Sequence, residues 1–313
     1  MFDKKISFVI PCYYSEKTLG GVVEGIMQEF PSEKYNIEII LVNDGSTDGT
    51  YKIICEYALK YSCVKGINLT KNFGQDNALM AGYNYSTGDY IVSLDDDQQN
   101  PPEEAHKLIK KLEEGSYDVV FGKYYVTKQS KFKIFGSWLN DKMANWLIQK
   151  PKDIKLCSYF VMTSLIKEEV IRYSGPYPYV WGLILRCAGR IGNEYIDHRA
   201  REIGKTNYTF RKNVKLWFNG FTAFSIKPMR LAILAGCLIG MIGVLFAIVI
   251  IVERIFVGMD VEGWTSLISV VLILAGVQLG VIGMMGEYIG RMYLYMGETP
   301  LFVVRETTEK IDN

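Results

Sequence analysis

Three consecutive aspartates, Asp95 to Asp97, close the apolar run that begins at Tyr90, and no Lys or Arg stands beside them. Neighbouring carboxylates repel one another unless a cation lies among them. Hard oxygen ligands at the end of a strand suit Mg²⁺ or Mn²⁺, which can bridge carboxylate and diphosphate oxygens. The aspartates therefore predict a divalent metal site, although taken alone they also fit a capped turn before a helix that begins near Pro101.

Polar residues also follow three other strand-like runs, at positions 11–16, 43–47 and 71–76. The predicted strands cover residues 6–11, 37–44, 64–70, 90–97 and 118–124. Between them apolar residues recur at three- and four-residue spacing, as in Leu19, Val22, Val23 and Ile26. This alternation predicts a parallel sheet covered on both faces, whose ligands bind beyond the carboxyl ends of the strands. We therefore expect the four polar clusters to form one site.

This site lacks the phosphate-binding motifs of two other classes. Neither GxGxxG nor GxxxxGK[ST] occurs, so little supports a dinucleotide dehydrogenase or a P-loop enzyme. The net charge is +1, without the basic excess typical of nucleic-acid-binding proteins. Residues 199–230 are the exception, with eight Lys or Arg and one Glu. This segment predicts a surface facing phosphates or lipid headgroups, with a solvated basic face as the alternative.

The beginning of the chain and its cysteines bear on the cellular compartment. The first residues contain charges and one short apolar run but no secretory signal, which predicts that this part stays in the cytoplasm. The six cysteines form no CxxC pair, which predicts reduced thiols rather than a zinc site or disulfides. They are Cys12, Cys55, Cys63, Cys157, Cys187 and Cys237.

Two apolar segments, residues 231–252 and 265–286, contain no charged residue. As helices at about 1.5 Å per residue, each reaches about 33 Å, which is enough to cross a hydrocarbon core of roughly 30 Å. One such helix could be buried in a soluble core, but two in tandem predict a transmembrane pair. Lys227 and Arg230 precede the first segment and Arg291 follows the second, so both chain ends are expected in the cytoplasm.

Five motifs in order carry a family resemblance. They are VIPCYYSE, LVNDGSTDGT, NFGQDNALMAGYNYSTGDYIVSLDDDQQNPPEE, HRAREIGKTNYTF and GEYIGRMY. With them the chain resembles the inverting glycosyltransferases of family 2, in the polyprenyl-phosphate branch that includes dolichyl-phosphate mannosyltransferase and bacterial undecaprenyl-phosphate sugar transferases. One such motif alone is weak evidence for the family, whereas five motifs in the right order are specific for it.

The resemblance implies a GT-A, Rossmann-like α/β head with a C-terminal pair of transmembrane helices, and it implies four regions. Residues 1–130 would form the nucleotide-sugar-binding core, and 131–229 an acceptor side with interfacial amphipathic helices. Residues 230–290 would form the transmembrane pair with a short extracytoplasmic link, and 291–313 a cytoplasmic tail. The aromatic and lysine-rich segments 131–155 and 214–226 are typical of helices at a membrane surface, although ordinary packed helices have the same pattern.

The resemblance also assigns site residues. The implied catalytic residues are Asp97, Arg201 and Lys205. The implied nucleotide-sugar-binding residues are Pro11, Tyr13, Glu16, Asp44, Lys71, Gln75, Asp95 and Asp96. The implied metal ligands are Asp95, Asp97 and Gln99, and the implied acceptor-side residues are Ser158, Arg199 and Tyr208. Arg201 is expected to bind phosphate, while Arg199 is expected to be a neighbouring solvated charge.

Four positions depart from the family pattern. Tyr14 replaces Asn, and Thr206 replaces Ser with its hydroxyl kept. Gln98 replaces Leu, which predicts an outward-pointing polar side chain. Ser158 stands where many relatives have an Asp that is discussed as a base or acceptor-site residue, so no such role carries over to it.

The implied reaction is a metal-dependent, inverting hexosyl transfer from a nucleotide-diphosphate sugar, with a UDP-sugar as the expected donor, to polyprenyl (undecaprenyl) phosphate. It would take place at the cytoplasmic face of the inner membrane, in a multi-pass protein, and would supply a donor for cell-envelope glycans. Mg²⁺ or Mn²⁺ would stabilise the leaving diphosphate. The lipid phosphate is already ionised near pH 7, since its second pKa is roughly 6, so a strong protein base is not required.

Two other functions share parts of this pattern. A processive polysaccharide synthase uses the same kind of sugar-nucleotide site, but the chain has no Q-x-x-R-W motif and only two predicted spans. A non-catalytic anchor or flippase subunit would not need the carboxylates of Asp44, Asp95 and Asp97. The spans also contain Gly236 and Gly240, Gly276 and Gly280, and the polar Gln278. These residues, with the tetramers known in this branch, predict a homo-oligomer, with a monomer as the alternative.

Overall fold

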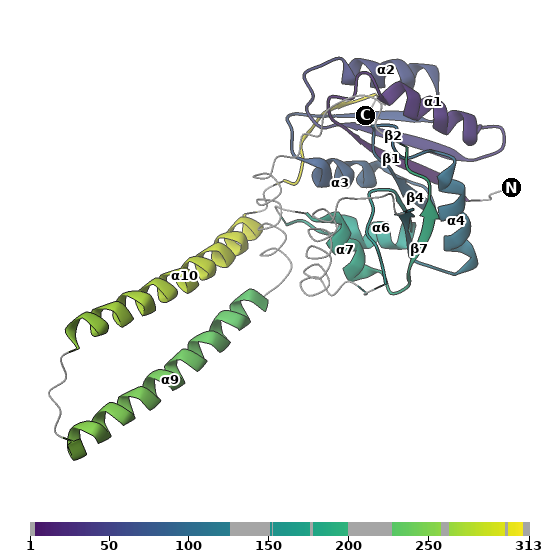
Figure 1. Cartoon of the computed structure of the whole chain (residues 1–313). Coiled ribbons are helices and arrows are strands. Elements are labelled where there is room, and N and C mark those ends of the chain that lie inside the picture. The colour runs from purple at the N-terminus through teal and green to yellow at the C-terminus, as the bar shows by residue number, and fades with distance from the viewer. Residues whose placement is uncertain are drawn as a thin grey trace. The chain divides into compact units, whose positions relative to one another are not determined.

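A computed structural model gives the structure of the protein and describes residues 4–125, 151, 153–175, 178–199, 227–257, 263–297 and 300–308. The chain divides into two compact units. The first contains residues Met1–Thr209 and Glu298–Asn313, and the second contains Phe210–Gly297. Figure 1 shows both units, with the helices and several of the strands labelled.

The first unit is built on a mixed sheet. Its described strands are β1 (Ile6–Cys12), β2 (Ile37–Asn43), β3 (Val64–Leu69), β4 (Tyr90–Ser93), β5 (Val119–Tyr124), β6 (Phe160–Thr163), β7 (Ile191–Ile196) and β8 (Val304–Thr307). They lie in the order β7-β5-β6-β4-β1-β2-β3-β8. Pairing is parallel from β4 through β1 and β2 to β3, and between β5 and β7. β6 is antiparallel to β4 and β5, and β8 to β3. The prediction of a wholly parallel sheet is therefore wrong outside the centre.

Helices cover both faces of this sheet. The described helices of the unit are α1 (Leu19–Glu29), α2 (Thr50–Lys60), α3 (Gln75–Tyr85), α4 (Glu104–Glu114), α6 (Ser164–Ile171) and α7 (Val180–Cys187). The apolar face predicted for α1 is confirmed, because Leu19, Val22, Val23 and Ile26 are all buried. They belong to one core cluster with Phe8 of β1 and Leu108 of α4. On the opposite face, α3 lies so close to β1 that a Cβ on Gly82 would fall 2.3 Å from Val9.

The fourth strand is shorter than the sequence predicts. β4 ends at Ser93, and the Leu94 N–H group donates a last bond of 3.4 Å to the Val9 carbonyl. Gln98 then adopts a left-handed backbone conformation with φ of 61°, which turns the chain. The three aspartates therefore lie in the loop after the strand and not within the strand.

The C-terminal segment contributes the edge strand β8, in the region for which the sequence predicts a tail. The Thr70 N–H group donates to the Val303 carbonyl at 2.9 Å, and Arg305 Nη2 donates to the Thr70 carbonyl at 3.1 Å. Asn68 Nδ2 donates to Glu306 Oε1 at 2.8 Å. The chain segment after the second unit thus returns to the sheet and fixes the end of β3.

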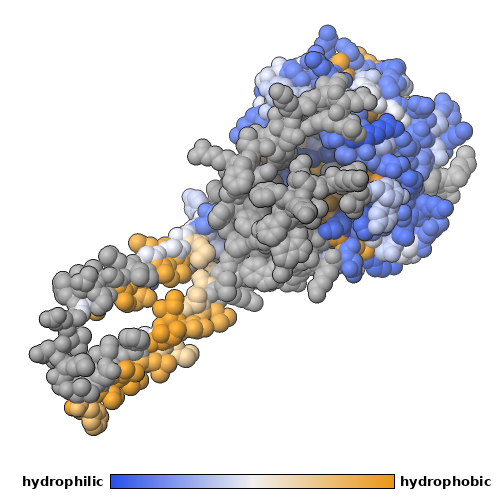
Figure 2. Space-filling view, viewed as in Figure 1, coloured by the Kyte–Doolittle hydropathy of each residue, from blue (hydrophilic) through white to orange (hydrophobic). Residues whose placement is uncertain are grey.

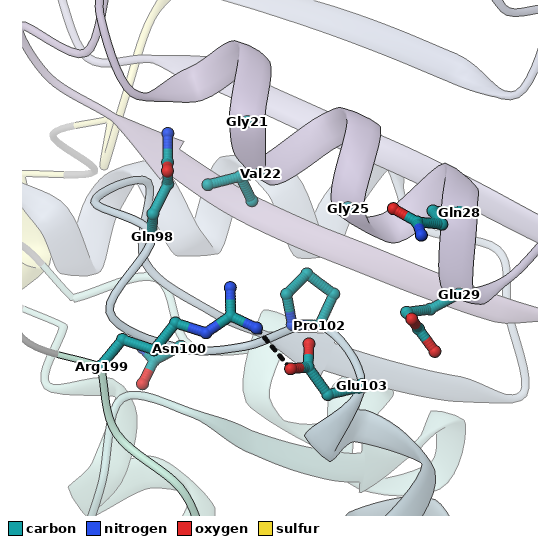
Figure 3. Close-up of a pocket in the computed structure, with 10 residues that line it drawn as sticks. All are labelled: Gly21, Val22, Gly25, Gln28, Glu29, Gln98, Asn100, Pro102, Glu103 and Arg199. Carbon is teal, nitrogen blue, oxygen red and sulfur yellow. Dashed lines mark hydrogen bonds and ion pairs between the residues drawn. The ribbon is translucent and has the colours of Figure 1, made fainter.

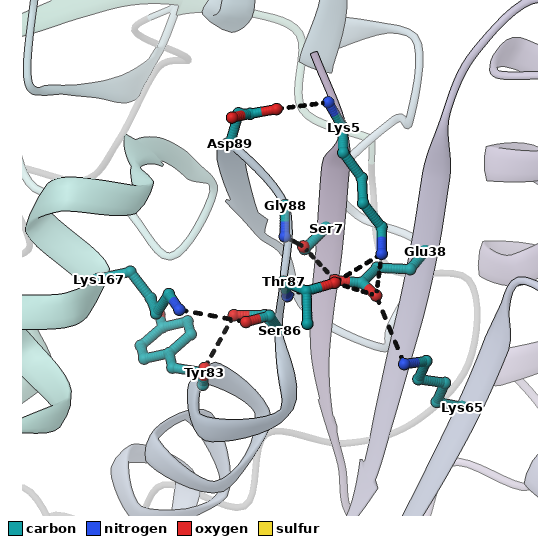
Figure 4. Close-up of polar contacts among 10 residues, drawn as sticks. All are labelled: Lys5, Ser7, Glu38, Lys65, Tyr83, Ser86, Thr87, Gly88, Asp89 and Lys167. Atoms are coloured by element: carbon teal, nitrogen blue, oxygen red, sulfur yellow. Dashed lines mark hydrogen bonds and ion pairs between the residues drawn. The ribbon is translucent and has the colours of Figure 1, made fainter. Parts of the chain in front are cut away.

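A buried carboxylate lies near the amino ends of the central strands (Figure 4). Glu38 of β2 stands opposite Ser7 of β1, and its side chain is only 2% exposed. Its carboxylate accepts from the Ser7 hydroxyl at 2.6 Å, from the Thr87 N–H group at 2.6 Å and from Lys5 Nζ at 2.8 Å. Burial alone would raise the pKa of Glu38, but the bonds from Lys5, Ser7 and Thr87 outweigh it and lower the pKa to about 2. This network joins β1, β2 and the segment before β4.

The second unit contains α9 (Lys227–Val257) and α10 (Trp264–Met296), which are 31 and 33 residues long. Many of their described apolar side chains are exposed, including those of Leu245, Ile255 and Leu279. Figure 2 shows hydrophobic side chains along both helices. Within the residues that the structure describes, no helix is both long and apolar enough to cross a membrane.

Candidate active site

The loop after β4 directs its three aspartates toward different partners. Asp96 turns toward the end of β1, where its carboxylate accepts from the Tyr13 N–H group at 3.1 Å and from the Ser15 hydroxyl. Desolvation, together with the charges of Asp95 and Asp97, raises the pKa of Asp96 to about 6 against these two hydrogen bonds. Asp96 therefore fixes the loop to β1.

Asp95 turns toward the other side of the loop. Its Oδ2 accepts from the Ser158 hydroxyl at 2.5 Å and from Asn100 Nδ2 at 3.4 Å. Its Oδ1 accepts from Gln75 Nε2, at the start of α3, at 3.0 Å. Asn100 in turn accepts from the Tyr124 hydroxyl of β5 at 2.8 Å. Asp95 is thereby held directly by the start of α3 and the segment before β6, and through Asn100 it is linked to β5.

The Asp97 carboxylate accepts a hydrogen bond within the loop itself, from the Gln99 N–H group to Oδ1 at 3.2 Å. In the described part of the chain, no three His, Cys, Asp or Glu side chains are grouped so that they could hold a metal ion together. Mg²⁺ does not require such a group, because it commonly binds one or two carboxylates and completes its shell with water and substrate phosphates. The oxygen donors of Asp97, Asp95 and Gln99 fit a metal shared with a diphosphate, and they do not form a closed cage.

Asp44, at the end of β2, orders the neighbouring loop. It is buried, and its two oxygens accept from the N–H groups of Phe73 at 2.7 Å and Gly74 at 2.9 Å. Burial raises the pKa of Asp44, and these two bonds oppose the shift. Gly45 has φ of +66°, and a Cβ there would lie 2.3 Å from the Lys71 backbone. The loops after β2 and β3 are therefore packed backbone to backbone.

The remaining predicted nucleotide-side residues lie at the same edge of the sheet. Pro11 is buried in β1 opposite Val42. Glu16 accepts from the Gly49 N–H group at 3.2 Å. Lys71 is exposed, with Nζ 5.1 Å from the centre of the Phe73 ring. Half-exposed Tyr13 extends from the end of β1.

The basic segment is described only at its beginning. Arg199 pairs with Glu103, and its N–H group donates to the Gln99 carbonyl at 2.9 Å. The Arg199 backbone is thus tied to the aspartate loop, while its side chain is 58% exposed and pairs with Glu103. Arg201, Lys205, Thr206 and Tyr208 lie outside the described residues.

A cavity of about 220 Å³ lies beside the same loop, between α1 and Arg199 (Figure 3). Gln98 lines it and donates from Nε2 to the Thr18 carbonyl at 2.7 Å. A Cβ on Gly21 would lie 2.4 Å from this amide. The predicted outward orientation of Gln98 is therefore wrong. Its side chain packs on α1 and connects the aspartate loop to that helix.

Sequence reasoning missed three residues that position the site. Ser15 holds Asp96, Asn100 contacts Asp95, and Tyr124 holds Asn100. Ser15 and Asn100 lie within quoted motifs, so their proximity to the predicted residues is a usable signal. No sequence signal identifies Tyr124, because its role depends on where β5 lies in the sheet.

Comparisons with known proteins identify a family, relatives of nearly full length and a similar fold. The family model described as Glycosyl transferase family 2 matches residues 7–173. An undecaprenyl-phosphate 4-deoxy-4-formamido-L-arabinose transferase of Proteus mirabilis (strain HI4320) is 32% identical, over 97% of this chain and 95% of its own length. A Bacillus subtilis (strain 168) glycosyltransferase named YkcC is 33% identical, over 96% of this chain and 93% of its own. The structure resembles that of glucosyl-3-phosphoglycerate synthase from Mycobacterium tuberculosis in complex with Mn²⁺, UDP and phosphoglyceric acid. The TM-score is 0.53 at 17% identity, over 70% of this chain and 77% of that one, and this likeness concerns the fold.

Proposed function

Because this chain belongs to glycosyl transferase family 2, with a GT-A-like α/β fold, we propose that it transfers a sugar from a nucleotide-diphosphate sugar to polyprenyl phosphate. The observation that carries the proposal is the likeness to an undecaprenyl-phosphate sugar transferase over 97% of this chain. That likeness includes α9 and α10 as well as the head. The donor is proposed to be a UDP-sugar, which the UDP bound in the similar glucosyl-3-phosphoglycerate synthase supports.

The proposed donor lies across the ends of β2, β1 and β4. Asp44 holds the loop of Lys71, and Gln75 and Ser158 hold Asp95. Asp97, with Asp95 and Gln99, would hold Mg²⁺ or Mn²⁺, which as a Lewis acid stabilises charge on the leaving diphosphate. The Mn²⁺ in the similar synthase supports this assignment.

The acceptor side is proposed to use the basic segment that begins at Arg199. Arg201 and Lys205 would pair with the diphosphate or with the lipid phosphate, and Tyr208 lies in the same segment. The lipid phosphate is ionised near neutral pH, so its oxygen attacks the anomeric carbon without a strong base. A single displacement inverts the configuration at that carbon.

We further propose that α9 and α10 form the transmembrane pair, with the head and both chain ends in the cytoplasm. The proposal rests on the uncharged segments 231–252 and 265–286, which lie within these helices. Exposure of their described apolar side chains supports it. Such a location would bring the head to the lipid acceptor.

Mass spectrometry of the lipid product tests the proposed function. Membranes containing the full-length chain would be supplied with polyprenyl phosphate, Mg²⁺ and a panel of sugar nucleotides. One sugar added to the polyprenyl phosphate is the expected product. A long polymer would indicate a polysaccharide synthase, and no turnover of any nucleotide sugar would indicate a non-catalytic subunit.

Replacing Ser158 with Asp is expected to lower the transfer rate at least about tenfold. The new carboxylate would face Asp95 at hydrogen-bond distance, and neighbouring like charges repel. Ser158→Thr keeps the hydroxyl donor and should remain within about threefold of the wild type. Steady-state rates at saturating donor measure both variants. A rate for Ser158→Asp at or above the wild-type rate would contradict the positioning of Asp95 by Ser158.

The chain is also proposed to form a homo-oligomer, specifically a tetramer, joined largely through α9 and α10. Among the described residues, no atom other than the neighbouring residues and nearby backbone of α10 itself lies within 4 Å of a Cβ built on Gly276 or Gly280. These glycines therefore present backbone for close approach by another helix, and exposed Gln278 lies between them. Native mass spectrometry in a mild detergent is expected to show the oligomer, and Gly276→Leu should dissociate it. A monomer unaffected by Gly276→Leu or Gln278→Leu would contradict the proposal.

A further inference from the structure

Tyr14, immediately after β1, has a strained backbone. Its φ is 56°, in the left-handed region that bulky side chains rarely adopt. Such a conformation is strained and persists where surrounding contacts enforce it, often at ligand sites. Asn or Gly would occupy this conformation more easily. The presence of a tyrosine at this strained position therefore indicates that its ring has a function.

Two hydrogen bonds hold Tyr14 in this conformation. Its N–H group donates to the Ser46 hydroxyl at 3.0 Å, and its own hydroxyl lies 2.9 Å from that of Thr47. Both partners belong to the loop after β2. The ring of Tyr14 is thus fixed over that loop, although the side chain is not enclosed and the residue is 51% exposed.

A second aromatic side chain stands beside it. The rings of Tyr13 and Tyr14 have centroids 4.6 Å apart and an interplanar angle of 76°, an edge-to-face pair. Tyr13 is 45% exposed. The bonds of Tyr14 to Ser46 and Thr47 place the pair beside the loop after β2, which begins at buried Asp44. The two rings therefore present apolar surface at the edge where the sequence motifs converge.

The position of the pair identifies which part of a donor it would meet. The carboxylates that would hold the diphosphate follow β4, on one side of β1. Tyr14 instead bonds to the loop after β2, on the other side. A nucleotide sugar whose diphosphate lies at the aspartate loop can direct an uncharged aromatic base toward β2. Stacking on an aromatic ring suits such a base, because every base has a π face.

We propose that the Tyr14 ring forms a wall of the nucleobase subsite and that its strained backbone is retained for this purpose. The proposal rests on the use of a nucleotide-diphosphate donor. It assigns to Tyr14 a specificity role for the base, while the diphosphate is held elsewhere.

The test measures nucleotide affinity and stability in the same variants. Full-length protein in detergent with Mg²⁺ would be titrated with UDP and, separately, with inorganic pyrophosphate. Tyr14→Asn removes the ring and accepts the left-handed backbone. Its UDP affinity should fall about tenfold, which corresponds to the loss of one stacking contact, while its pyrophosphate affinity stays unchanged. Its thermal midpoint should rise because the strain is relieved. Tyr14→Phe keeps the ring and should bind UDP within about threefold of the wild type.

Ser116 provides a matched control for strain. It has φ of 48° in the exposed turn after α4, before the amino end of β5. Ser116→Asn should raise the thermal midpoint without changing UDP affinity. Unchanged UDP affinity in Tyr14→Asn, or an equal loss for pyrophosphate, would overturn the nucleobase assignment. A wild-type protein that binds none of UDP, ADP, CDP and GDP would overturn the donor proposal and this inference with it.

Discussion

Asp97→Ala is expected to reduce transfer of sugar to polyprenyl phosphate at least about a hundredfold, the scale on which single charge-stabilising groups act in catalysis. Asp97 is only partly buried, and it accepts a hydrogen bond from the Gln99 N–H group of its own loop. Its removal therefore takes a metal ligand from the proposed site but leaves the core intact. The thermal midpoint should stay close to that of the wild type.

Two variants separate the charge of Asp97 from its shape. Asp97→Asn keeps an oxygen acceptor for the Gln99 N–H group but loses the negative charge, so it should be nearly as inactive as Asp97→Ala. Glu114→Ala removes an exposed carboxylate near the end of α4 and should have the wild-type rate. Transfer at the wild-type rate by Asp97→Ala, or by wild-type protein treated with a chelator, would contradict the metal assignment.

The strands predicted from the sequence correspond to β1 to β5, because near-continuous apolar runs between amphipathic helices identify buried strands locally. The positions of the other three strands depend on partners distant in the chain. β6 has only four residues and lies between β4 and β5 in antiparallel orientation. β8 pairs with β3 only after the chain returns from the second unit. No local pattern contains this information.

The composition of the site was predictable, but its internal geometry was not. The motifs identify the aspartate loop and its neighbours at the carboxyl ends of the strands. They do not show that Asp96 and Asp95 face opposite sides of the loop, toward Ser15 and Ser158. These orientations follow from the turn at Gln98 and from the position of β6 beside β4. Sequence adjacency alone predicts mutual repulsion, which the structure partly offsets by giving each carboxylate its own donors.

Glu38 shows the same limit of sequence-based prediction, here for a residue that stabilises the fold. Within the run Ile-Glu-Ile-Ile-Leu-Val, a single Glu has the pattern of a side chain on the exposed face of a strand. It is buried instead, because Lys5 and Lys65 lie on the strands or segments beside it. The cations that balance it are separated from it by about thirty residues of sequence in each direction.

Glu38→Gln is expected to lower the free energy of unfolding of the first unit by roughly 3 kcal/mol at pH 7. The folded pKa is about 2 and the ordinary value is 4.5, and each pKa unit corresponds to about 1.4 kcal/mol. Because the folded pKa is depressed, this contribution is fully present above about pH 4.5 and is lost as the pH falls toward 2. The difference between wild type and Glu38→Gln should therefore shrink between pH 4.5 and pH 2.

Urea titrations of the full-length chain in detergent, followed by near-ultraviolet circular dichroism, measure this difference at pH 7, 4 and 2.5. Glu24→Gln is the matched control, because Glu24 pairs with Lys60 at 2.6 Å while both side chains are about half exposed. Solvent screens an exposed pair, so this control should change the free energy of unfolding little at any pH. A Glu38→Gln deficit as large at pH 2.5 as at pH 7 would mean that lost packing, rather than the charge network of Lys5, Ser7 and Thr87, causes the destabilisation.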